Sequence, residues 1–359
     1  MAEKGPSRQR RGRPRQAEVA RLAGVSQTTV SLVLGGNKQG IALHEDTRAR
    51  VLAAARELGY VPDPAARRLA AARNNLLGVF SFTATFPTAV EHSYYPILVG
   101  VEQEAAAQGY DLVLFTGSSP GGAQAGDPGA LNRVRLADGC LFLGRHVPDD
   151  QLRKLVADGY PAVHIGRRDE LEGLAWVGAD YVAASAEVVR RLSGLGHRRI
   201  VLVREDDDAP ASTDREHGFR TALAEYAGPR ADPSAVVRTT HPADDITPGW
   251  VRDRLAEGVT AFVAEETDSG AAWRALHAAV AAAGLDAPDD LSLALLGSPP
   301  ADLAAARPPT GFDIPRAELG AAAVRMLTAQ LSGEDHTEPL VACGFRAGST
   351  AGPPPGRTG

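Results

Sequence analysis

Residues 74–352 alternate between short apolar runs and longer amphipathic stretches, and this alternation is the feature that most constrains the fold. The apolar runs predict strands at 76–82, 111–116, 140–143, 162–165, 199–203, 261–264 and 291–296. The stretches between them predict helices at 97–108, 151–158, 182–195, 216–226, 248–257 and 269–283. Such alternation is typical of parallel sheets covered by helices on both faces. We therefore expect an α/β body of doubly wound parallel sheets.

The first 73 residues differ from this body in charge. They hold 14 Lys and Arg against 6 Asp and Glu, whereas the remainder holds 24 against 38. The net charge of -6 therefore conceals a basic head on an acidic body, a distribution typical of a DNA-binding head. At 359 residues the chain also exceeds the usual size of one core, which indicates two or more domains.

The head has the pattern of a helix-turn-helix. A helical apolar period begins at Ala17, stops at Gly24 and resumes after Ser26, which we expect to cap the second helix. A third helix is predicted at 45–58, with Gly59 closing it. The second helix keeps a polar face free. We expect a small all-α helix-turn-helix DNA-binding domain at residues 16–62.

The head resembles that of the LacI/GalR (lactose-repressor) family. The similarity is carried, in identity and spacing, by residues 19–26 (VARLAGVS), 29–31 (TVS), 47–48 (TR) and 57–62 (ELGYVP). It implies that Gln27, Thr28 and Leu32 of the second helix face base edges. It also implies that Ser26 and Thr29 lie near phosphates. Gln can pair bidentately with adenine, and Thr can hydrogen-bond a base or touch a thymine methyl.

Leu32 departs from the family pattern, in which many members carry arginine. Two interpretations stay open for this residue. Either an apolar base contact replaces a guanine contact at one operator position, or Leu32 joins the core of the head.

Residues 63–73 predict a short helix, with Asp63 as its cap and a proline in the first turn. A helix this short is marginal alone, so we expect it to form against DNA or a partner. The resemblance implies a hinge helix whose two copies pair in the minor groove. By this resemblance the two copies pair through Ala66, while Arg67 and Arg68 lie near phosphates and Leu69 wedges between base pairs. A plain linker helix is the alternative.

Residues 1–15 form a predicted disordered basic arm. Its arginines Arg11, Arg13 and Arg15 lie in a Gly-Arg-Pro context that is similar to an AT-hook, which places arginine in narrow A·T minor grooves. An arm that only attracts phosphates is an equal alternative.

The resemblance extends over about residues 17–352, through 177–180 (VGAD) and 194–200 (GLGHRRI). It implies a periplasmic-binding-protein-like body at 74–352, made of two doubly wound parallel-sheet subdomains joined by three crossovers, with a ligand cleft between them. We place one subdomain at about 76–178 plus a late segment. The other covers about 179–308 plus the C-terminal segment, and residues 353–359 are a predicted disordered tail.

The cleft implied by the resemblance is unusual in its polar groups. Arg215 matches the arginine that grips effector hydroxyls or carboxylates, and we add Arg167, Glu265 and Ser298 as candidate effector ligands. Residues 265–266 are Glu-Glu where many members have Asn-Asp, and 297–300 are GSPP where they have Gly-Phe-Asp-Asp. A standard sugar clamp is thus missing. Arg215 could instead be a surface residue paired with Asp214 or near Glu216.

The sequence argues against several other classes. It has no Gly-x-Gly-x-x-Gly after the first strand, no P-loop, no catalytic constellation and no metal-ligand spacing around its two cysteines. It also lacks an apolar run approaching the roughly 20 residues of a membrane span, and a signal peptide. We expect a cytoplasmic, nucleoid-associated protein that is not an enzyme and has no cofactor.

These observations predict a transcription regulator, most simply a repressor. Its expected partners are pseudo-palindromic double-stranded operator DNA, a second copy of the chain in a homodimer, and a small-molecule effector, a sugar or related metabolite. The alternative is an effector-independent or protein-regulated DNA binder with a degenerate cleft.

Overall fold

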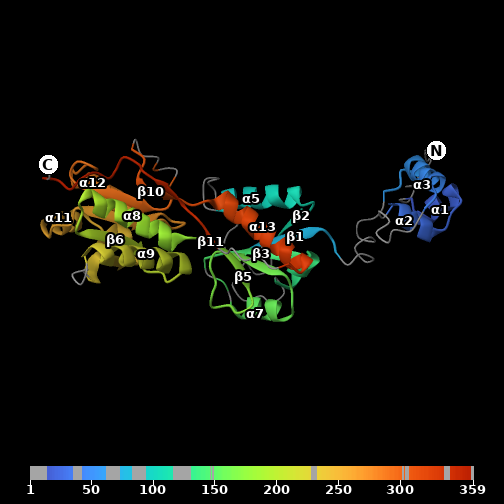
Figure 1. Cartoon of the computed structure of the whole chain (residues 1–359), viewed down its shortest axis with the longest axis horizontal. Helices are drawn as coiled ribbons and strands as arrows, with labels where there is room; N and C mark the ends of the chain where they lie inside the picture. Colours follow the sequence, from blue (N-terminus) through green and yellow to red (C-terminus); the bar gives the residue numbers. More distant parts are fainter. Residues whose placement is uncertain are drawn as a thin grey trace, which may run out of the picture. The chain divides into compact units, whose positions relative to one another are not determined.

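The computed structural model describes residues 14–34, 43–61, 73–82, 94–115, 131–145, 147, 149–227, 233–300, 303, 307–334 and 340–356 (Figure 1). The chain divides into two compact units, residues 1–74 and 75–359, which we call the head and the body. The predicted hinge residues Ala66, Arg67, Arg68 and Leu69 lie outside the described residues, as do Arg11 and Arg13 of the predicted arm.

The head consists of three helices around a small core: α1 (Gln16–Ala23), α2 (Gln27–Leu34) and α3 (Glu45–Leu58). Each helix contributes one fully buried valine, namely Val19, Val30 and Val51. Gly24 has a φ of 64°, a left-handed conformation that ends α1 and lets the chain turn directly into α2. The predicted helix-turn-helix is confirmed.

The body contains two six-stranded sheets. In the first the strand order is β11-β5-β4-β3-β1-β2, and in the second β12-β10-β9-β8-β6-β7. The strand pairs are parallel except β10 with β12. The strands are β1 (Leu76–Ser81), β2 (Asp111–Phe115), β3 (Gly139–Leu143), β4 (Ala162–Ile165), β5 (Ala175–Ala179), β6 (Ile200–Glu205), β7 (Val236–Thr239), β8 (Ala261–Glu265), β9 (Ser292–Leu296), β10 (Thr310–Asp313), β11 (Leu340–Val341) and β12 (Gly344–Arg346).

Helices cover both sheets. We call the first sheet with its helices the N-lobe and the second the C-lobe. The N-lobe holds α5 (Tyr94–Ala107), the 3-10 helix η1 (Arg133–Leu136), α7 (Asp149–Ala157) and α13 (Arg316–Ser332). The C-lobe holds α8 (Tyr181–Leu195), α9 (Pro210–Ala227), the 3-10 helix η3 (Pro233–Ala235), α10 (Pro242–Asp245), α11 (Pro248–Ala256) and α12 (Ala271–Ala282).

Both faces of each sheet are buried, as the apolar strand sequences predict. In β1, Leu77 and Val79 belong to the core that includes α5 and α13, whereas Phe80 belongs to the core on the other face, with Leu152 of α7. In β6 of the C-lobe, Leu202 packs in the core with α8 and α9, and the next residue packs in the core with α12. The predicted α/β, doubly wound parallel architecture is confirmed.

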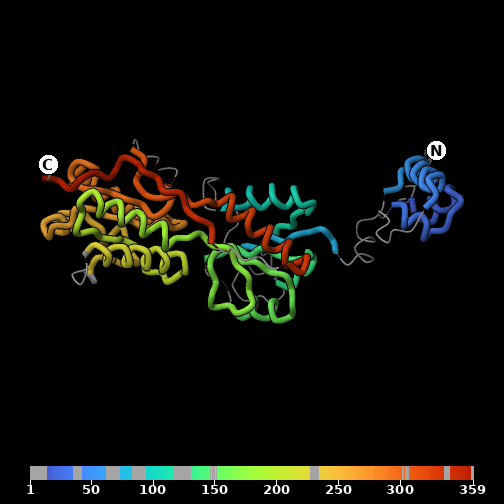
Figure 2. The backbone as a smooth tube through the Cα atoms, in the orientation of Figure 1, coloured from blue at the N-terminus to red at the C-terminus, as the bar shows by residue number. Residues whose placement is uncertain are grey.

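The chain passes between the lobes three times, and Figure 2 lets these passages be followed. They lie between β5 and α8, between β10 and α13, and between β11 and β12. Because of the later passages, α13 and β11 belong to the N-lobe although they follow most of the C-lobe in sequence. The two lobes are therefore joined by three connections, as predicted.

Helix α13 is the largest element that the sequence analysis does not predict. Its buried residues include Leu319, Ala323, Val324 and Leu327, which occur on several sides of the helix. The reason is that α13 lies between α5 and the strands β3, β4 and β5. A helix enclosed in this way has no continuous polar face, so the amphipathic period that reveals surface helices is weak.

Two glycines allow α5 and α13 to approach closely. A Cβ atom on Gly100 of α5 would lie 1.8 Å from the carbonyl oxygen of Ala317, and one on Gly320 of α13 would lie 2.2 Å from that of Ile97. Both neighbours are backbone atoms, which a rotamer change cannot move away. The N-lobe therefore requires glycine at both positions.

We predict that Gly100→Ala lowers the free energy of unfolding of the body by about 1–3 kcal/mol, because the two helices must separate. Gly194→Ala is the matched control, since Gly194 lies in α8 and a Cβ there meets no atom within 4 Å. In an open helical site alanine is neutral or stabilising, by up to about 1 kcal/mol. Urea unfolding measures both variants, and equal midpoints would contradict the close approach.

A second prediction concerns His164 of β4, which is 1 % exposed and whose Nδ1 donates to the carbonyl of Gly166 at 2.8 Å. Burial and the charge of Arg168 lower the pKa of His164 to about 3. In the unfolded chain a histidine titrates near pH 6.5, so between about pH 6.5 and 3 only the unfolded chain takes up the proton. Stability is thus lost as pH falls, by about 1.4 kcal/mol per pH unit from this residue.

His164→Asn should remove this contribution. The measurement is the free energy of unfolding of both proteins between pH 7 and 5, where the variant is expected to show a slope shallower by about 1 kcal/mol per unit or more. The absolute stability of the variant is not the readout, since the substitution also changes packing. Parallel slopes would show that His164 takes up its proton over the same pH range in the folded body as in the unfolded chain.

Candidate nucleic-acid interface and ligand cleft

The start of α2 presents polar side chains to solvent. The Oγ of Ser26 accepts a hydrogen bond from the backbone amide of Thr29 at 3.1 Å, so Ser26 caps α2 as predicted. Gln27 and Thr28 follow in the first turn and are exposed. A helix N-terminus combines amides that lack helical partners with the positive end of the helix dipole. This end of α2 can therefore meet a phosphate while its side chains reach base edges.

Leu32 is half-buried, and the core of the head is contacted by its neighbours Val33 and Leu34. Among the described residues, Leu32 does not belong to that core cluster. Arg15 is exposed, and its backbone amide donates to a carboxylate oxygen of Glu18 at 2.9 Å in the first turn of α1. The base and phosphate contacts assigned to these side chains stay predictions.

A cavity of about 150 Å³ lies in the body, lined by residues of both lobes. On the N-lobe side its wall is formed by segments that follow β3 and β4 and by the end of β5. On the C-lobe side it is formed by the first turns of α9 and by residues 266–268, after β8. These segments leave the carboxyl ends of parallel strands, the edge where ligands bind in doubly wound sheets.

Arg215 lies at this cavity and is 3 % exposed. Its Nε donates to the carbonyl oxygen of Leu296 at 2.9 Å and its Nη1 to that of Ala211 at 3.1 Å. The guanidinium carbon lies 3.9 Å from the ring centroid of Tyr181, a cation-π contact that fixes the plane of the fork. The alternative that Arg215 is a surface residue paired with Asp214 is wrong, because it is buried and Asp214 pairs with Arg167.

Arg167 follows β4 and also lines the cavity. It donates to both carboxylate oxygens of Asp214 in α9, from Nε at 2.9 Å and from Nη2 at 2.6 Å, and pairs as well with Asp169. The preceding Gly166 has a φ of 120°, a conformation that favours glycine and turns the chain out of the strand. Two carboxylates thus hold Arg167 in one orientation.

The two consecutive glutamates at the end of β8, Glu265 within the strand and Glu266 just after it, have different surroundings. Glu265 is 1 % exposed, accepts a hydrogen bond from the amide of Glu205 at 2.8 Å, and does not line the described part of the cavity. Burial raises the pKa of Glu265. Glu266 does line the cavity, and its carboxylate accepts from the amide of Ser298 at 2.8 Å and from Arg316 at 2.5 Å. Side chains alternate along a strand, so a shift of one residue exchanges a core position for a cleft position.

Of the four residues predicted for the effector, Arg167 and Arg215 line the cavity, whereas Glu265 and Ser298 do not. The Oγ of Ser298 accepts from Arg316 at 3.2 Å. Tyr181, Arg316 and Arg145 are among the lining residues that were not predicted from the sequence. One signal could have found Arg145: a Gly-Arg pair follows β3 at 144–145 just as another follows β4 at 166–167.

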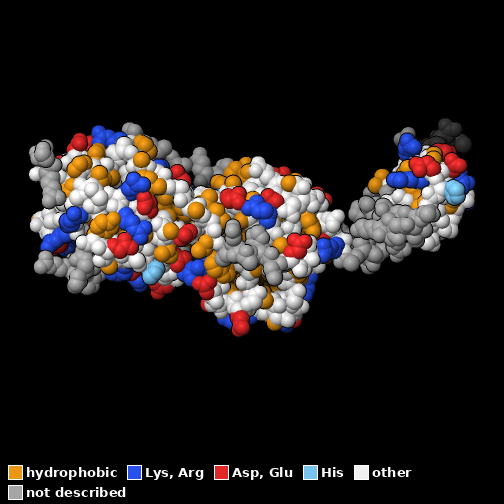
Figure 3. Space-filling view, in the orientation of Figure 1, with side chains coloured by type: hydrophobic (Ala, Val, Ile, Leu, Met, Phe, Trp, Pro, Cys, Tyr) orange, Lys and Arg blue, Asp and Glu red, His pale blue; other side chains and the backbone are white. Residues whose placement is uncertain are grey.

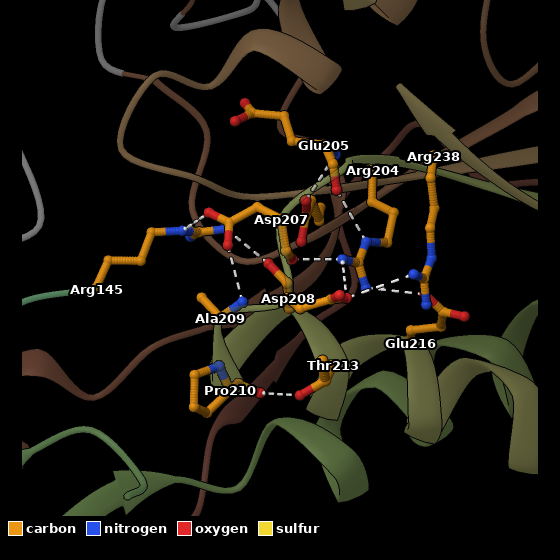
Figure 4. A network of polar contacts seen from close by, with 12 residues as sticks. Arg145, Arg204, Glu205, Asp207, Asp208, Ala209, Pro210, Thr213, Glu216 and Arg238 are labelled. Atoms are coloured by element: carbon orange, nitrogen blue, oxygen red, sulfur yellow. Dashed lines mark hydrogen bonds and ion pairs between the residues drawn. The ribbon is translucent and has the colours of Figure 1, made fainter. Parts of the chain in front are cut away.

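Arg145 reaches the loop after β6, as Figure 4 shows. It pairs with the carboxylate of Asp207 and donates to the Oγ of Ser212 at 2.8 Å. Behind this loop Arg204 of β6 is fully buried and donates to Glu216 of α9 at 2.8 Å. Asp207 and Asp208 of the acidic run 206–208 therefore take part in a network of ion pairs.

Glu216 joins α9 to this network. Burial alone would raise its pKa, but the hydrogen bond from Arg220 and the charges of Arg238, Arg220 and Arg204 lower it below the ordinary value. The carboxylate is therefore ionised, and the buried guanidinium of Arg204 has its counter-charge. A buried pair of this kind is costly to break, because either partner alone would be left as an unpaired charge.

The described residues contain neither a metal-binding cluster nor a helix suited to span a membrane. No group of three or more His, Cys, Asp or Glu side chains there could hold a metal ion, and Cys140 and Cys343 are free thiols. None of the described helices combines the length and apolar character needed to cross a membrane. The face of the body seen in Figure 3 mixes basic and acidic side chains over both lobes.

Comparison with known proteins assigns each part of the chain to a family. Residues 17–63 match the bacterial regulatory proteins of the lacI family. Residues 83–241 match the periplasmic binding proteins and sugar binding domain of the LacI family, and residues 189–344 match a periplasmic binding protein-like domain. The predicted head and body classes are thus confirmed.

Named relatives cover more than nine-tenths of the chain. The HTH-type transcriptional regulator CelR of Thermobifida fusca is 31 % identical over 338 residues, which cover 92 % of this chain and 96 % of that protein. A solved complex of the transcriptional regulator CelR with cellobiose is 27 % identical, with a TM-score of 0.62, and covers 94 % of this chain and 100 % of that one. A lac repressor dimer bound to operator and the anti-inducer ONPF is 21 % identical with a TM-score of 0.70, covers 94 % and 99 %, and shows the common fold.

These relatives are named as transcriptional regulators, in agreement with the expectation that the chain is not an enzyme. The chain belongs to the LacI family of transcriptional regulators, with a DNA-binding head and a periplasmic-binding-protein-like, ligand-binding body.

Proposed function

We propose that this regulator is a sequence-specific repressor that binds a pseudo-palindromic operator as a homodimer and changes its operator affinity when a small molecule occupies the cleft. The observation that carries the proposal is the exposed, capped N-terminus of α2, where Gln27 and Thr28 are free to enter a major groove. The relative solved with operator DNA is a dimer, which supports the same assembly here.

In this proposal the head reads sequence with few side chains. Gln27 pairs with adenine and Thr28 with a neighbouring base, while Ser26 and Thr29 lie near phosphates. Leu32 supplies an apolar contact, because it is half-buried and stands apart from the core cluster. Hinge helices at residues 63–73 pair through Ala66 and kink the minor groove with Leu69, while Arg67 and Arg68 contact phosphates.

For the cleft we propose a sugar or a related metabolite. The solved relative in complex with cellobiose supports this class, and so does Arg215, whose fork is held against Tyr181 at the cavity. Effector binding then shifts the lobes between two arrangements and changes the pairing of the hinge helices.

A second candidate is a regulator that needs no small effector. The observation that favours it is that Arg167 and Arg316, which line the cavity, are each already engaged by a carboxylate. Fewer free polar groups then remain for a ligand. In this case a partner protein, or the amount of the regulator itself, would control repression.

Selection of bound DNA from a random pool tests the head. We predict that Thr28→Ala changes the recovered sequence at one position of each half-site, with a loss of about 1–3 kcal/mol for the original site. Arg67→Ala, the comparison variant, should weaken binding to all sequences alike and reduce the salt dependence by about one phosphate contact. If both variants lose affinity equally for selected and random DNA, the base-contact assignment fails.

A thermal-shift screen tests the cleft, with cellobiose as the first compound in a panel of sugars and phosphorylated metabolites. A true effector at 100 times its dissociation constant adds about 2.7 kcal/mol to the stability of the body. Arg215→Lys should reduce this gain, because lysine lacks the planar fork. Arg190→Lys is the control, since Arg190 forms an exposed ion pair with Glu225 within the C-lobe. No shift across the panel would favour the effector-independent alternative.

A further inference from the structure

Among the described residues, three ion pairs join the two lobes. In each of them the N-lobe supplies the arginine and the C-lobe supplies the carboxylate. Arg145 after β3, Arg167 after β4 and Arg316 at the start of α13 all belong to the N-lobe. Their partners belong to the C-lobe and are, in the same order, Asp207, Asp214 and Glu266. The facing surfaces of the two lobes are therefore complementary in charge.

Each of the three arginines makes more than one hydrogen bond to the C-lobe. Arg167 donates two hydrogen bonds to Asp214, at 2.9 and 2.6 Å. Arg316 donates to Glu266 at 2.5 Å and to the Oγ of Ser298 at 3.2 Å, again across the lobes. Arg145 adds a hydrogen bond to the Oγ of Ser212 at 2.8 Å. Such forked contacts fix geometry as well as charge.

The pairs are also partly shielded from water. The exposed fractions of their six side chains range from 12 % for Glu266 to 30 % for Arg167. Salt screens partly buried charges far less than exposed ones, and their attraction is correspondingly stronger. These contacts therefore lie between ordinary surface ion pairs, which contribute little, and fully buried ion pairs, which are costly to break.

Asp207 is held in place by contacts within the C-lobe. Asp207 accepts a hydrogen bond from the amide of Ala209 at 2.8 Å, and its carbonyl accepts one from Arg204 at 2.5 Å. Arg204 is itself fully buried against Glu216, as Figure 4 shows. Arg204 thus acts as a positioning residue for the loop that carries Asp207.

We propose that the pairs Arg145–Asp207, Arg167–Asp214 and Arg316–Glu266 form a latch that holds the two lobes closed on each other. The three chain passages between the lobes act as the hinge, and the latch sets the balance between closed and open arrangements. That this balance regulates operator binding rests on the proposed function. The latch itself does not, because it concerns the body alone.

Charge reversal gives the latch a diagnostic test. Asp214→Arg places two arginines against each other and should open the lobes, whereas Arg167→Asp combined with Asp214→Arg restores an attractive pair and should close them again. Glu225→Arg is the matched control, since Glu225 also lies in α9 but pairs with Arg190 inside the C-lobe. It reverses the charge of one side chain, as Asp214→Arg does, and breaks no contact between the lobes.

The measurement is the distance between spin labels on the two lobes, obtained by pulsed electron spin resonance on the full chain. Labels are attached at Lys154→Cys in α7 and Thr221→Cys in α9, two exposed positions, in a Cys343→Ser background that leaves the buried Cys140. Labelled protein is diluted into excess unlabelled protein, so that distances within one chain dominate whatever the oligomeric state.

The expected result is a shift of the distances in the Asp214→Arg variant, reversal of that shift in the doubly exchanged variant, and no shift in Glu225→Arg. If Asp214→Arg does not fold, Arg145→Gln combined with Arg167→Gln supplies the same comparison by removing two pairs. Unchanged distances in the pair-breaking variant, or a failure of the exchanged pair to restore them, would overturn the latch. Either result leaves the DNA-binding proposal untouched, because neither operator nor effector is present.

Discussion

The direction of the strands is the constraint on which the rest of the body depends. Parallel strands must be joined by crossovers, so every strand of a sheet delivers its following loop to the same edge. In the N-lobe that edge receives Arg145 and Arg167 from two adjacent strands, and in the C-lobe the corresponding loops bring Asp207 and Glu266. The strand topology therefore decides where the cleft lies and which loops line it. The individual residues of those loops then decide its charges.

Burial on both faces explains which parts of this architecture the sequence predicts. Apolar runs such as β3 and β8 are unmistakable because every residue in them is buried. The same enclosure conceals α13, whose apolar residues surround the helix. It also conceals short strands such as β11, which has only two residues and pairs with β5 from far along the chain. Hydrophobic periodicity reveals elements that have one solvent-exposed face, and it fails for elements that are buried on all sides.

The side chains of the cleft, like the helices and strands, could be predicted from the sequence only in part. Sequence alone selected Arg215 and Arg167, since a motif gave the positions and arginine suits oxygen-rich ligands. It chose Glu265 over Glu266, because the end of a strand cannot be placed to one residue from pattern, and that residue decides between core and cleft. It could not have paired Arg316 with Glu266 at all, since 50 residues separate them and only the passage after β10 brings them together.

The ion pairs between the lobes need not be strong to matter. Opening the cleft exchanges each pair for water, which returns much of the lost attraction, so the net cost per pair is of the order of 1 kcal/mol. Three such pairs together match the coupling of about 1–3 kcal/mol that is usual between an effector site and a distant function. A ligand of modest differential affinity could therefore offset the latch, whereas pairs buried as deeply as Arg204 and Glu216 would lock the lobes permanently. The partly exposed setting of the cross-lobe pairs is what makes them reversible.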